Sequence, residues 1–496
     1  MNIAFLFRCF ALLGALFIAG GQVLVAQEIV FSAAQRFANQ ISEYDVAGRT
    51  EQGVLLHKWG SHYSVVEVLD ERDLSVKWSK EVRIADKPRA QVRYLAALRN
   101  EVVIFYTVKQ KRHQYLYAQI VDSRLEPIGE DRLIDSLRTD FGTPNLGWQF
   151  LLSPDRNQLG LLRSNANLNT LQSLTFMALS TGLDVQGKHT FMLDSKRSPA
   201  ILKSYLSNEG EVWLCVGDKR VRASNTERYE DYTILAYRPE DNWMRQVDIK
   251  SPNDYSIGSL TFKHDYRNQR VVVAGFYSDR GRNSSAGFFR TYIENNADSA
   301  SAYVFTPFHP DFIKQANRSH LVAQNELVNL AASDLIVRHD GGILLLGESY
   351  YTSQQTIMRS AFDSFSNRIP DQITSYYYND MIALSANADG TEHWSRIIQK
   401  KQFSEDDGGY YASFAALNLK SVLHLIFNED IRYDTQTSDC VLDAVTGEYR
   451  ILSLPGNKQL NNILPAPRYA RQLWANAVIF PAFTNRNEFL LAKISF

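Results

Sequence analysis

The feature that most constrains this chain is a repeat of short apolar segments separated by polar turns. The segments are rich in Val, Ile, Leu, Tyr and Phe and are bounded by Gly, Asn, Asp and Pro, a pattern typical of strands and hairpins. Seven polar turns lead from an apolar segment to a further strand, at Asp70, Asp122, Ser180, Pro239, Glu294, Asn387 and Asp443. They are 52 to 59 residues apart, except for one interval of 93 residues before Asn387. A period just above 50 residues, with about four strands per repeat, predicts the blades of a β-propeller.

The two ends of the chain are predicted to complete the ring together. Strand-like runs at 477–483 and 488–495 follow the seventh turn, but no outer strand follows them. Residues 28–33 (EIVFSA) can supply that strand, so that the last sheet has no open edge. We therefore expect an all-β fold: a propeller of seven or eight four-stranded blades, with eight favoured.

Two of the turns share a tryptophan motif. Asp73 and Asp389 are each followed by four residues, a Trp (Trp78 and Trp394), a Ser and a cation. The expected role of these rings is structural, because a large ring at the start of an outer strand can cover the gap between two blades. The Asp-x-Gly-x-Thr-Trp spacing of the sialidase Asp-box is absent, so sialidase chemistry is not supported.

The long interval is predicted to contain two insertions. The first, at about 307–331, has Pro310 at a favourable first helical position and apolar residues at helical spacing, which predicts a helix over about 310–325. The second, at about 350–375, is rich in Ser, Gln and Tyr and predicts a long exposed loop, a common place for binding functions.

The N-terminus has the composition of a secretory signal. Residues 1–26 contain one cation, Arg8, then an apolar run that Gly20 and Gly21 interrupt before it reaches the length of a membrane span. Cleavage after Ala26 leaves a single propeller domain over 27–496 with no transmembrane anchor. We expect the protein to be exported, either periplasmic or secreted.

Composition adds two exclusions. The chain has 53 Lys+Arg against 54 Asp+Glu, a net charge of -1, so no basic excess indicates a nucleic-acid partner. Signal removal leaves two cysteines, Cys215 and Cys440, both in apolar strand-like stretches. Buried free thiols are favoured over a disulfide between them, and no Cys/His spacing predicts a zinc site.

Polar residues become denser between 334 and 430, which makes this the predicted working face of the ring. The candidate binding residues are Asp340, Glu348, Lys400, Lys401, Gln402, Asp406, Asp407, Tyr410, Tyr411 and Asn428. Over about 309–430 the order of a helix, an Asp340-Gly-Gly strand, the 394–402 segment and the 407–411 Asp-Gly-Gly-Tyr-Tyr turn resembles a family of uncharacterised exported β-propellers from Bacteroidota. The resemblance implies a periplasmic or secreted propeller, and it implies no reaction or ligand.

Four interpretations of this region stay open at this stage. The Asp-Gly-Gly segments are favourable tight turns, because Gly accepts positive φ and Asp can bond its own backbone. Asp340, Asp406 and Asp407 also offer oxygen ligands for Ca²⁺, although no EF-hand spacing is present and no other cofactor is indicated. Asp340 and Asp407 could instead act as acid and base in a glycoside hydrolase or lyase. Recognition of a protein or a glycan by tyrosines is the fourth, through Tyr376, Tyr377, Tyr378, Tyr410 and Tyr411.

The favoured function is a non-catalytic binding or scaffold module at the cell envelope, whose partner is an envelope protein or a glycan. A carbohydrate-active enzyme is the alternative. It requires two carboxylates that converge within about 5–10 Å in one pocket.

Overall fold

A computed structural model describes the chain from residue 27 to residue 496 with some internal gaps. The gaps are at 62, 85–86, 88, 100, 139–146, 168–169, 195–197, 220–230, 280–283, 296, 318–321, 324–325, 358–370, 432–435 and 455–461. The predicted export signal at 1–26 lies outside the described residues.

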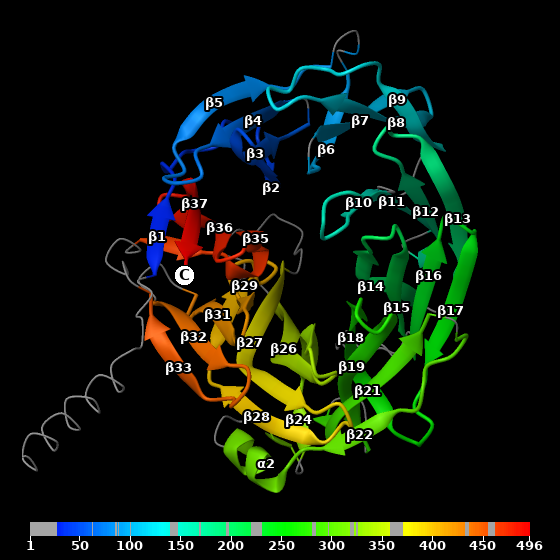
Figure 1. Cartoon of the computed structure of the whole chain (residues 1–496). Helices are drawn as coiled ribbons and strands as arrows, with labels where there is room; N and C mark the ends of the chain where they lie inside the picture. Colours follow the sequence, from blue (N-terminus) through cyan, green and yellow to red (C-terminus); the bar gives the residue numbers. More distant parts are fainter. Residues whose placement is uncertain are drawn as a thin grey trace, which may run out of the picture.

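Eight antiparallel sheets are arranged as blades around a ring (Figure 1). The first strand of each of the first seven blades lies toward the centre, and the fourth lies at the rim. Blades one to four are, in order, β2 (Glu43–Thr50), β3 (Gly53–Trp59), β4 (Ser64–Leu69), β5 (Val76–Glu81); β6 (Gln91–Ala97), β7 (Val102–Gln110), β8 (His113–Val121), β9 (Arg132–Arg138); β10 (Trp148–Leu152), β11 (Leu159–Asn167), β12 (Thr170–Leu179), β13 (Val185–Met192); β14 (Ser198–Leu206), β15 (Val212–Lys219), β16 (Asp231–Arg238), β17 (Trp243–Ile249).

The remaining blades include the insertions and both chain ends. Blades five to eight are, in order, β18 (Ser256–Asp265), β19 (Arg270–Ser278), β21 (Gly287–Glu294), β22 (Val304–Pro307); β25 (Leu330–Val337), β26 (Ile343–Ile357), β27 (Asp371–Ala386), β28 (Glu392–Ile398), with β29 (Gln402–Glu405); β30 (Phe414–Leu419), β31 (Val422–Asn428), β32 (Thr437–Asp443), β33 (Tyr449–Ser453); β34 (Ile463–Pro465), β35 (Arg471–Trp474), β36 (Ala477–Thr484), β37 (Phe489–Ser495) and β1 (Glu28–Phe31). A small sheet of β20 (Ser284–Ser285), β24 (Glu326–Val328) and β23 (Val322–Ala323) lies beside blade five.

The ring closes as predicted, with strands from both ends of the chain. β1 pairs antiparallel with β37, from Glu28 opposite Ser495 to Phe31 opposite Ala492, and is the outer strand of blade eight. β34 and β35 both pair with β36 on the inner side of the same blade. The preference for eight blades over seven is therefore confirmed.

The core lies between the blades. Eight apolar clusters of buried residues each join two neighbouring blades, and together they cover all eight junctions of the ring. The second strands are buried along most of their length, as β7 and β19 show, because a neighbouring blade covers each of their faces. Outer strands alternate instead, and in β17 every second residue is exposed or half-buried.

The polar turns and the tryptophan motif have the predicted structural roles. All seven turns fall between the third and fourth strands of a blade, and in several of them an Asp side chain accepts bonds from backbone amides two residues on. Trp394 packs in the cluster between blades six and seven, and its Nε1 donates to Val445 O at 3.1 Å. Trp78 is half-buried against the cluster between blades one and two.

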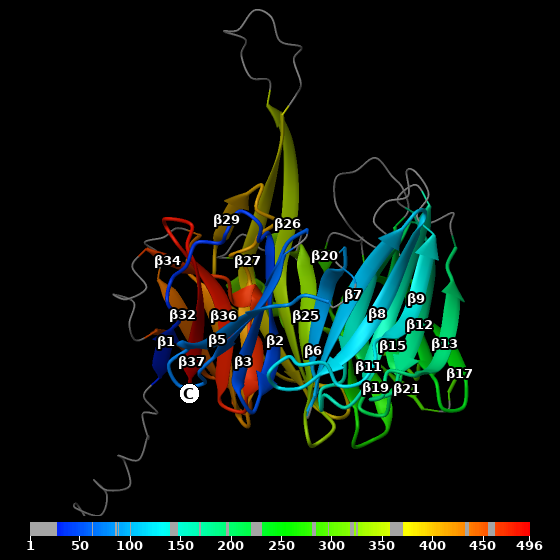
Figure 2. The ribbon, with the colours of Figure 1, turned by 90° about the horizontal axis from the view of Figure 1, so that it is seen from above.

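The insertions differ in detail from the prediction. The helix α2 (Pro310–Asn317) begins at Pro310 and packs Phe312 and Ala316 into the cluster between blades five and six. It ends before 325, since Val322–Ala323 form β23. The second insertion is not a loop from 350 onward, because β26 and β27 continue as a long hairpin that projects from one face of the ring (Figure 2).

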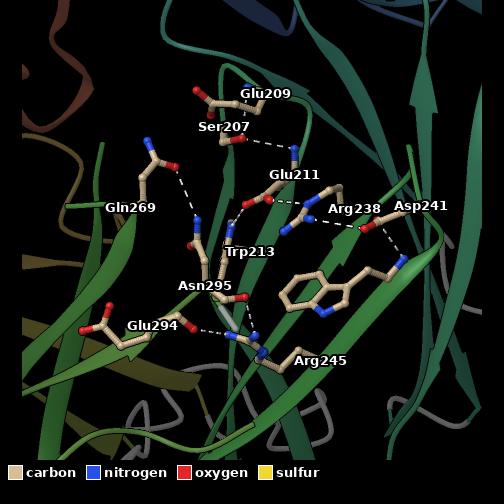
Figure 3. A network of polar contacts seen from close by, with 11 residues as sticks. Ser207, Glu209, Glu211, Trp213, Arg238, Asp241, Arg245, Gln269, Glu294 and Asn295 are labelled. Atoms are coloured by element: carbon tan, nitrogen blue, oxygen red, sulfur yellow. Dashed lines mark hydrogen bonds and ion pairs between the residues drawn. The ribbon is translucent and has the colours of Figure 1, made fainter. Parts of the chain in front are cut away.

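Polar contacts also join adjacent blades at the rim. Figure 3 shows Arg238 donating to Glu211 Oε1 (2.6 Å) within blade four. Arg245 on β17 donates to the backbone oxygens of Glu294 (2.7 Å) and Asn295 (2.6 Å) in blade five. Both guanidinium groups lie over the ring of Trp243, at 4.8 and 4.4 Å from its centroid. This network is structural, because its charges bind one another or backbone groups.

Other expectations concern cysteines and membrane spans. Cys215 and Cys440 are buried free thiols, as favoured from the sequence, and burial raises the pKa of both to about 12. Within the described ranges, no helix has the length and apolar character needed to cross a membrane.

Acid is expected to destabilise the protein through His57 on β3. The side chain is 1% exposed, its Nε2 lies 2.9 Å from Ser64 Oγ, and burial lowers its pKa from 6.5 to about 3. Between those pH values the unfolded chain binds a proton that the folded chain does not. The contribution of neutral His57 to the free energy of unfolding is therefore fully present above about pH 6.5. As the pH falls below that value, the free energy of unfolding decreases by about 1.4 kcal/mol per pH unit.

The check compares the wild type with His57→Gln. Urea unfolding at about pH 7 and about pH 5 measures how much stability each protein loses. We expect the wild type to lose more than the variant. Equal losses would show that His57 does not carry this pH dependence.

Candidate functional site

The ten residues predicted as one site separate into different environments. Glu348, Lys400, Gln402 and Asn428 are buried, whereas Lys401 and Asp406 are exposed. Tyr410 and Tyr411 are half-buried and lie in the segment between β29 and β30. Asp340 lies in the turn between β25 and β26, at the end of the blade opposite to Lys400.

Lys400 and Glu348 form a buried ion pair at the centre of a polar network. Their side chains are 0% and 4% exposed, and Lys400 Nζ lies 2.5 Å from Glu348 Oε1. The ammonium group also donates to Gln402 Oε1 (2.9 Å) and to Tyr378 O (3.2 Å). Burial lowers the pKa of Lys400 below its ordinary 10.5, and the charge of Glu348 opposes this shift. All three donor protons thus have protein acceptors, which leaves this ammonium committed to structure.

The same network holds the segment that carries Tyr410 and Tyr411. Ser413 donates through Oγ to Glu348 Oε2 (2.6 Å) and through its backbone amide to Gln402 Oε1 (2.7 Å). Asn428 Nδ2 donates to Tyr411 O (3.0 Å) and to Pro465 O (2.8 Å). Side chains from blades six and seven therefore hold the C-terminal end of the 406–413 segment, and Asn428 also ties it to blade eight.

The carboxylates of Asp340 and Asp407 each accept hydrogen bonds within their own tight turn. Asp340 accepts from the amide of Gly342 (3.0 Å) and from Arg338, and these bonds lower its pKa. Asp407 accepts from Ser404 Oγ (2.7 Å) and from the amide of Gly409 (2.8 Å). The turn interpretation is therefore the one that these bonds support for both Asp-Gly-Gly segments.

Asp406 is the third aspartate of the calcium interpretation. Asp406 accepts from the amide of Thr374 at 2.8 Å and lies apart from the Asp340 turn. In the part of the chain that the structure describes, no group of three or more His, Cys, Asp or Glu side chains is placed to hold a metal ion. The bonds made by Asp340, Asp406 and Asp407 do not support the calcium interpretation.

Tyr410 lines a pocket at the inner edge of the ring, which we call the inner-edge pocket. Its volume is about 480 Å³, and it lies between the start of β2, the 3-10 helix η1 (Pro467–Tyr469) with the start of β35, and the 406–413 segment. Its lining residues are Ser42, Glu43, Tyr44, Asp45, Val46, Tyr410, Arg468, Tyr469, Ala470, Arg471 and Pro481. The pocket is thus formed by blades one and eight and by the segment that enters blade seven.

Aromatic rings form one wall of the inner-edge pocket. Tyr410 stacks on Tyr469, with centroids 4.6 Å apart and an interplanar angle of 27°. Tyr411 packs edge-on against Tyr410 at 4.9 Å, and Phe483 supports both rings. Tyr469 is 45% exposed, so the stack is open to solvent on the side of Tyr469.

Charged groups complete the pocket. Arg471 donates to Asp45 Oδ1 (2.8 Å) across the junction of blades eight and one. Arg468 donates to Tyr378 Oη (2.8 Å), at the base of the projecting hairpin. The hydroxyls of Tyr44 and Tyr410 are buried and have no hydrogen-bond partner among the described residues. Burial, followed by the nearby Tyr411 and Tyr469, raises the pKa of Tyr44, so its hydroxyl stays protonated at neutral pH.

Sequence reasoning placed Tyr410 and Tyr411 at the site but missed their neighbours. Tyr44, Arg468, Tyr469 and Arg471 come from blades one and eight, which are far from residue 410 in the sequence. The cluster Arg468-Tyr-Ala-Arg471, which runs from η1 into the first residue of β35, was the available signal. Only the closure of the ring brings these segments together.

A second hollow lies between blades six and seven. Its volume is about 820 Å³, and its lining includes Lys401, Tyr351 and Tyr377 together with Phe427 and Glu429. Tyr351 and Tyr377 stack at 4.5 Å with an interplanar angle of 9°. Lys401 therefore belongs to a different hollow from Tyr410.

Comparisons with known proteins gave matches among solved structures only. No protein-family model matches the sequence, and no curated protein matches it. Among solved structures, the chain is similar to the Dos1 propeller, with a TM-score of 0.43 and 8% identity over 94% of this chain and 95% of that chain. The chain's own ring of eight blades shows that the fold is a β-propeller.

Two further solved structures match the chain at a comparable level. The β-propeller domain of the Trilobed protease from Pyrococcus furiosus has a TM-score of 0.36 and 11% identity, over 83% of this chain and 94% of that chain. The polysaccharide lyase Uly1 has a TM-score of 0.37 and 10% identity, over 81% of this chain and 89% of that chain. Similarity at this level transfers no activity to this chain.

Proposed function

We propose that this protein is an exported, non-catalytic binding or scaffold module of the cell envelope, periplasmic or secreted, and that its ligand occupies the inner-edge pocket. The observation that carries the proposal is the stacked pair Tyr410 and Tyr469, which lines a concave site together with four charged residues. Concave sites of this size with aromatic walls and a few polar groups are the usual form of ligand sites.

The support of the Tyr410 segment also favours a binding role. A binding surface gains affinity when its contact residues are already held in place, because less conformational freedom is lost on association. The backbone of Tyr411 is held by Asn428, and Ser413, two residues further on, is held by Glu348 and Gln402. These buried residues act as positioning residues for the pocket.

The carbohydrate-active enzyme requires two carboxylates that face the same ligand. Asp340 and Asp407 lie in two different turns and each accepts a bond from a backbone amide of its own turn. Glu348 is paired with Lys400. The inner-edge pocket has carboxylates of its own, Glu43 and Asp45, but Asp45 is bonded to Arg471. The test is to incubate an oligosaccharide with the wild type and with Glu43→Gln. If only the wild type releases sugar, the protein is a hydrolase and the non-catalytic proposal is wrong.

Affinity capture from the native envelope is expected to retain a specific ligand. The tagged full chain is incubated with solubilised envelope and washed with salt, and the retained proteins and glycans are identified by mass spectrometry. Changing both Tyr410 and Tyr411 to Ala is expected to abolish retention, because it removes the stacked wall of the pocket.

The control for this capture is Phe403→Ala. Phe403 is 42% exposed on β29 and does not line the inner-edge pocket. We expect it to retain the ligand as the wild type does. An empty capture with the wild type, or equal loss with both variants, would contradict the proposal, provided that thermal unfolding shows all three proteins folded.

A further inference from the structure

We infer that the inner-edge pocket binds a neutral saccharide unit of a glycan through the stacked Tyr410 and Tyr469 and the polar groups around them. The inference rests on the proposed binding function and specifies the chemical class of its ligand. Three properties of the pocket support it: its aromatic wall, its charge balance and its size.

The aromatic wall matches one face of a sugar ring. A pyranose presents C–H groups on its faces and hydroxyls around its rim, so it packs flat on an aromatic ring while its rim binds polar groups. Tyrosine suits this contact because it has a rigid apolar ring and a polar tip. Tyr469 is 45% exposed while Tyr410 supports it at 4.6 Å, which leaves a supported ring with open area.

The charges around the pocket favour a neutral ligand. Arg468 and Arg471 contribute two positive charges, and Glu43 and Asp45 contribute two negative charges. An anionic ligand would bring its charge close to both carboxylates, and a cation would meet both guanidinium groups. Sugar hydroxyls both donate and accept, so they can bond carboxylates and guanidinium groups in the same site.

The size of the pocket favours a small unit over the flat surface of a folded protein. Its volume of about 480 Å³ lies within the range of about 300–1,000 Å³ for small-molecule sites. Stable protein partners instead bury about 800 Å² on each side of a broad contact. One unit of a longer glycan can therefore fill the pocket while the rest of the chain lies outside it.

Calorimetric titration of the full chain tests the inference. The probes are maltohexaose, cellohexaose, xylohexaose and mannohexaose, the neutral glycan fraction released from the native envelope, and hexagalacturonate as an acidic probe. We expect at least one neutral probe to bind and hexagalacturonate to bind more weakly. Tyr469→Ala is expected to weaken binding by about tenfold or more, and Tyr469→Phe, which keeps the ring, by less.

The matched control is again Phe403→Ala, an exposed aromatic of similar exposure outside the pocket. We expect it to bind within about twofold of the wild type. Failure of every neutral probe, stronger binding of hexagalacturonate, or no effect of Tyr469→Ala would overturn the inference. If the wild type still captures an envelope protein and the Tyr410→Ala/Tyr411→Ala variant does not, the binding function stands and only the saccharide ligand is wrong. If both experiments are negative, both fail.

Discussion

Replacing Lys400 by Met is expected to lower the free energy of unfolding by about 3–5 kcal/mol. The variant leaves Glu348 buried without its ammonium partner, since the two side chains are 0% and 4% exposed in the pair. An uncompensated buried charge is among the most destabilising single changes in a protein. Urea unfolding followed by circular dichroism at neutral pH measures the loss.

The control for this prediction removes both charges. In Lys400→Met/Glu348→Gln the amide still accepts from Ser413, and no buried charge remains. We expect the double variant to be more stable than Lys400→Met alone, because the penalty comes mainly from the orphaned carboxylate. A double variant no more stable than the single variant would show that other bonds of Lys400, such as those to Gln402 and Tyr378, carry the effect.

Replacing Trp394 by Ala is expected to cost about 3–5 kcal/mol of stability. Its ring is 6% exposed, packs between blades six and seven, and donates to Val445 O. Gly447, at positive φ, leaves the space that the ring fills, since a Cβ there would lie 2.5 Å from Trp394. The cavity left by Ala therefore lies in a junction of the ring, and thermal and urea unfolding measure the loss.

Trp78 provides the matched comparison, because it stands at the same position of the same motif in blade one. Trp78 is only half-buried, so folding removes less of its apolar surface from water than it removes for Trp394. We expect Trp78→Ala to cost less than Trp394→Ala. Equal losses of stability in Trp78→Ala and Trp394→Ala would show that the burial of the ring does not set the cost.

Much of the fold could be predicted from local sequence patterns. The turns at Asp70, Asp122 and Ser180 follow one another at intervals of 52 and 58 residues, because each of these blades is built from four consecutive antiparallel strands. The pairing of β1 with β37 followed from counting strands in an incomplete last repeat. The extent of the β26–β27 hairpin was not predictable, because Ser, Gln and Tyr suit an exposed ribbon as well as a loop.

The candidate site was predictable only in part, because burial and closure are long-range properties. Lys400 and Glu348 are 52 residues apart, and nothing local distinguishes a buried pair from two solvated charges. Tyr410 meets Tyr44 and Tyr469 only after blades one and eight have closed the ring. The sequence pattern thus located Tyr410 alone among the lining residues, and the closure of the ring supplied the others.

The most direct test of the central claim, a ligand bound at the inner-edge pocket, is a crystal structure of the full chain soaked with the tightest-binding neutral hexasaccharide. We predict a sugar ring stacked on Tyr469, with its hydroxyls near Asp45 and Arg471. A sugar in the hollow beside Tyr351 and Tyr377, with the inner-edge pocket empty, would contradict the account.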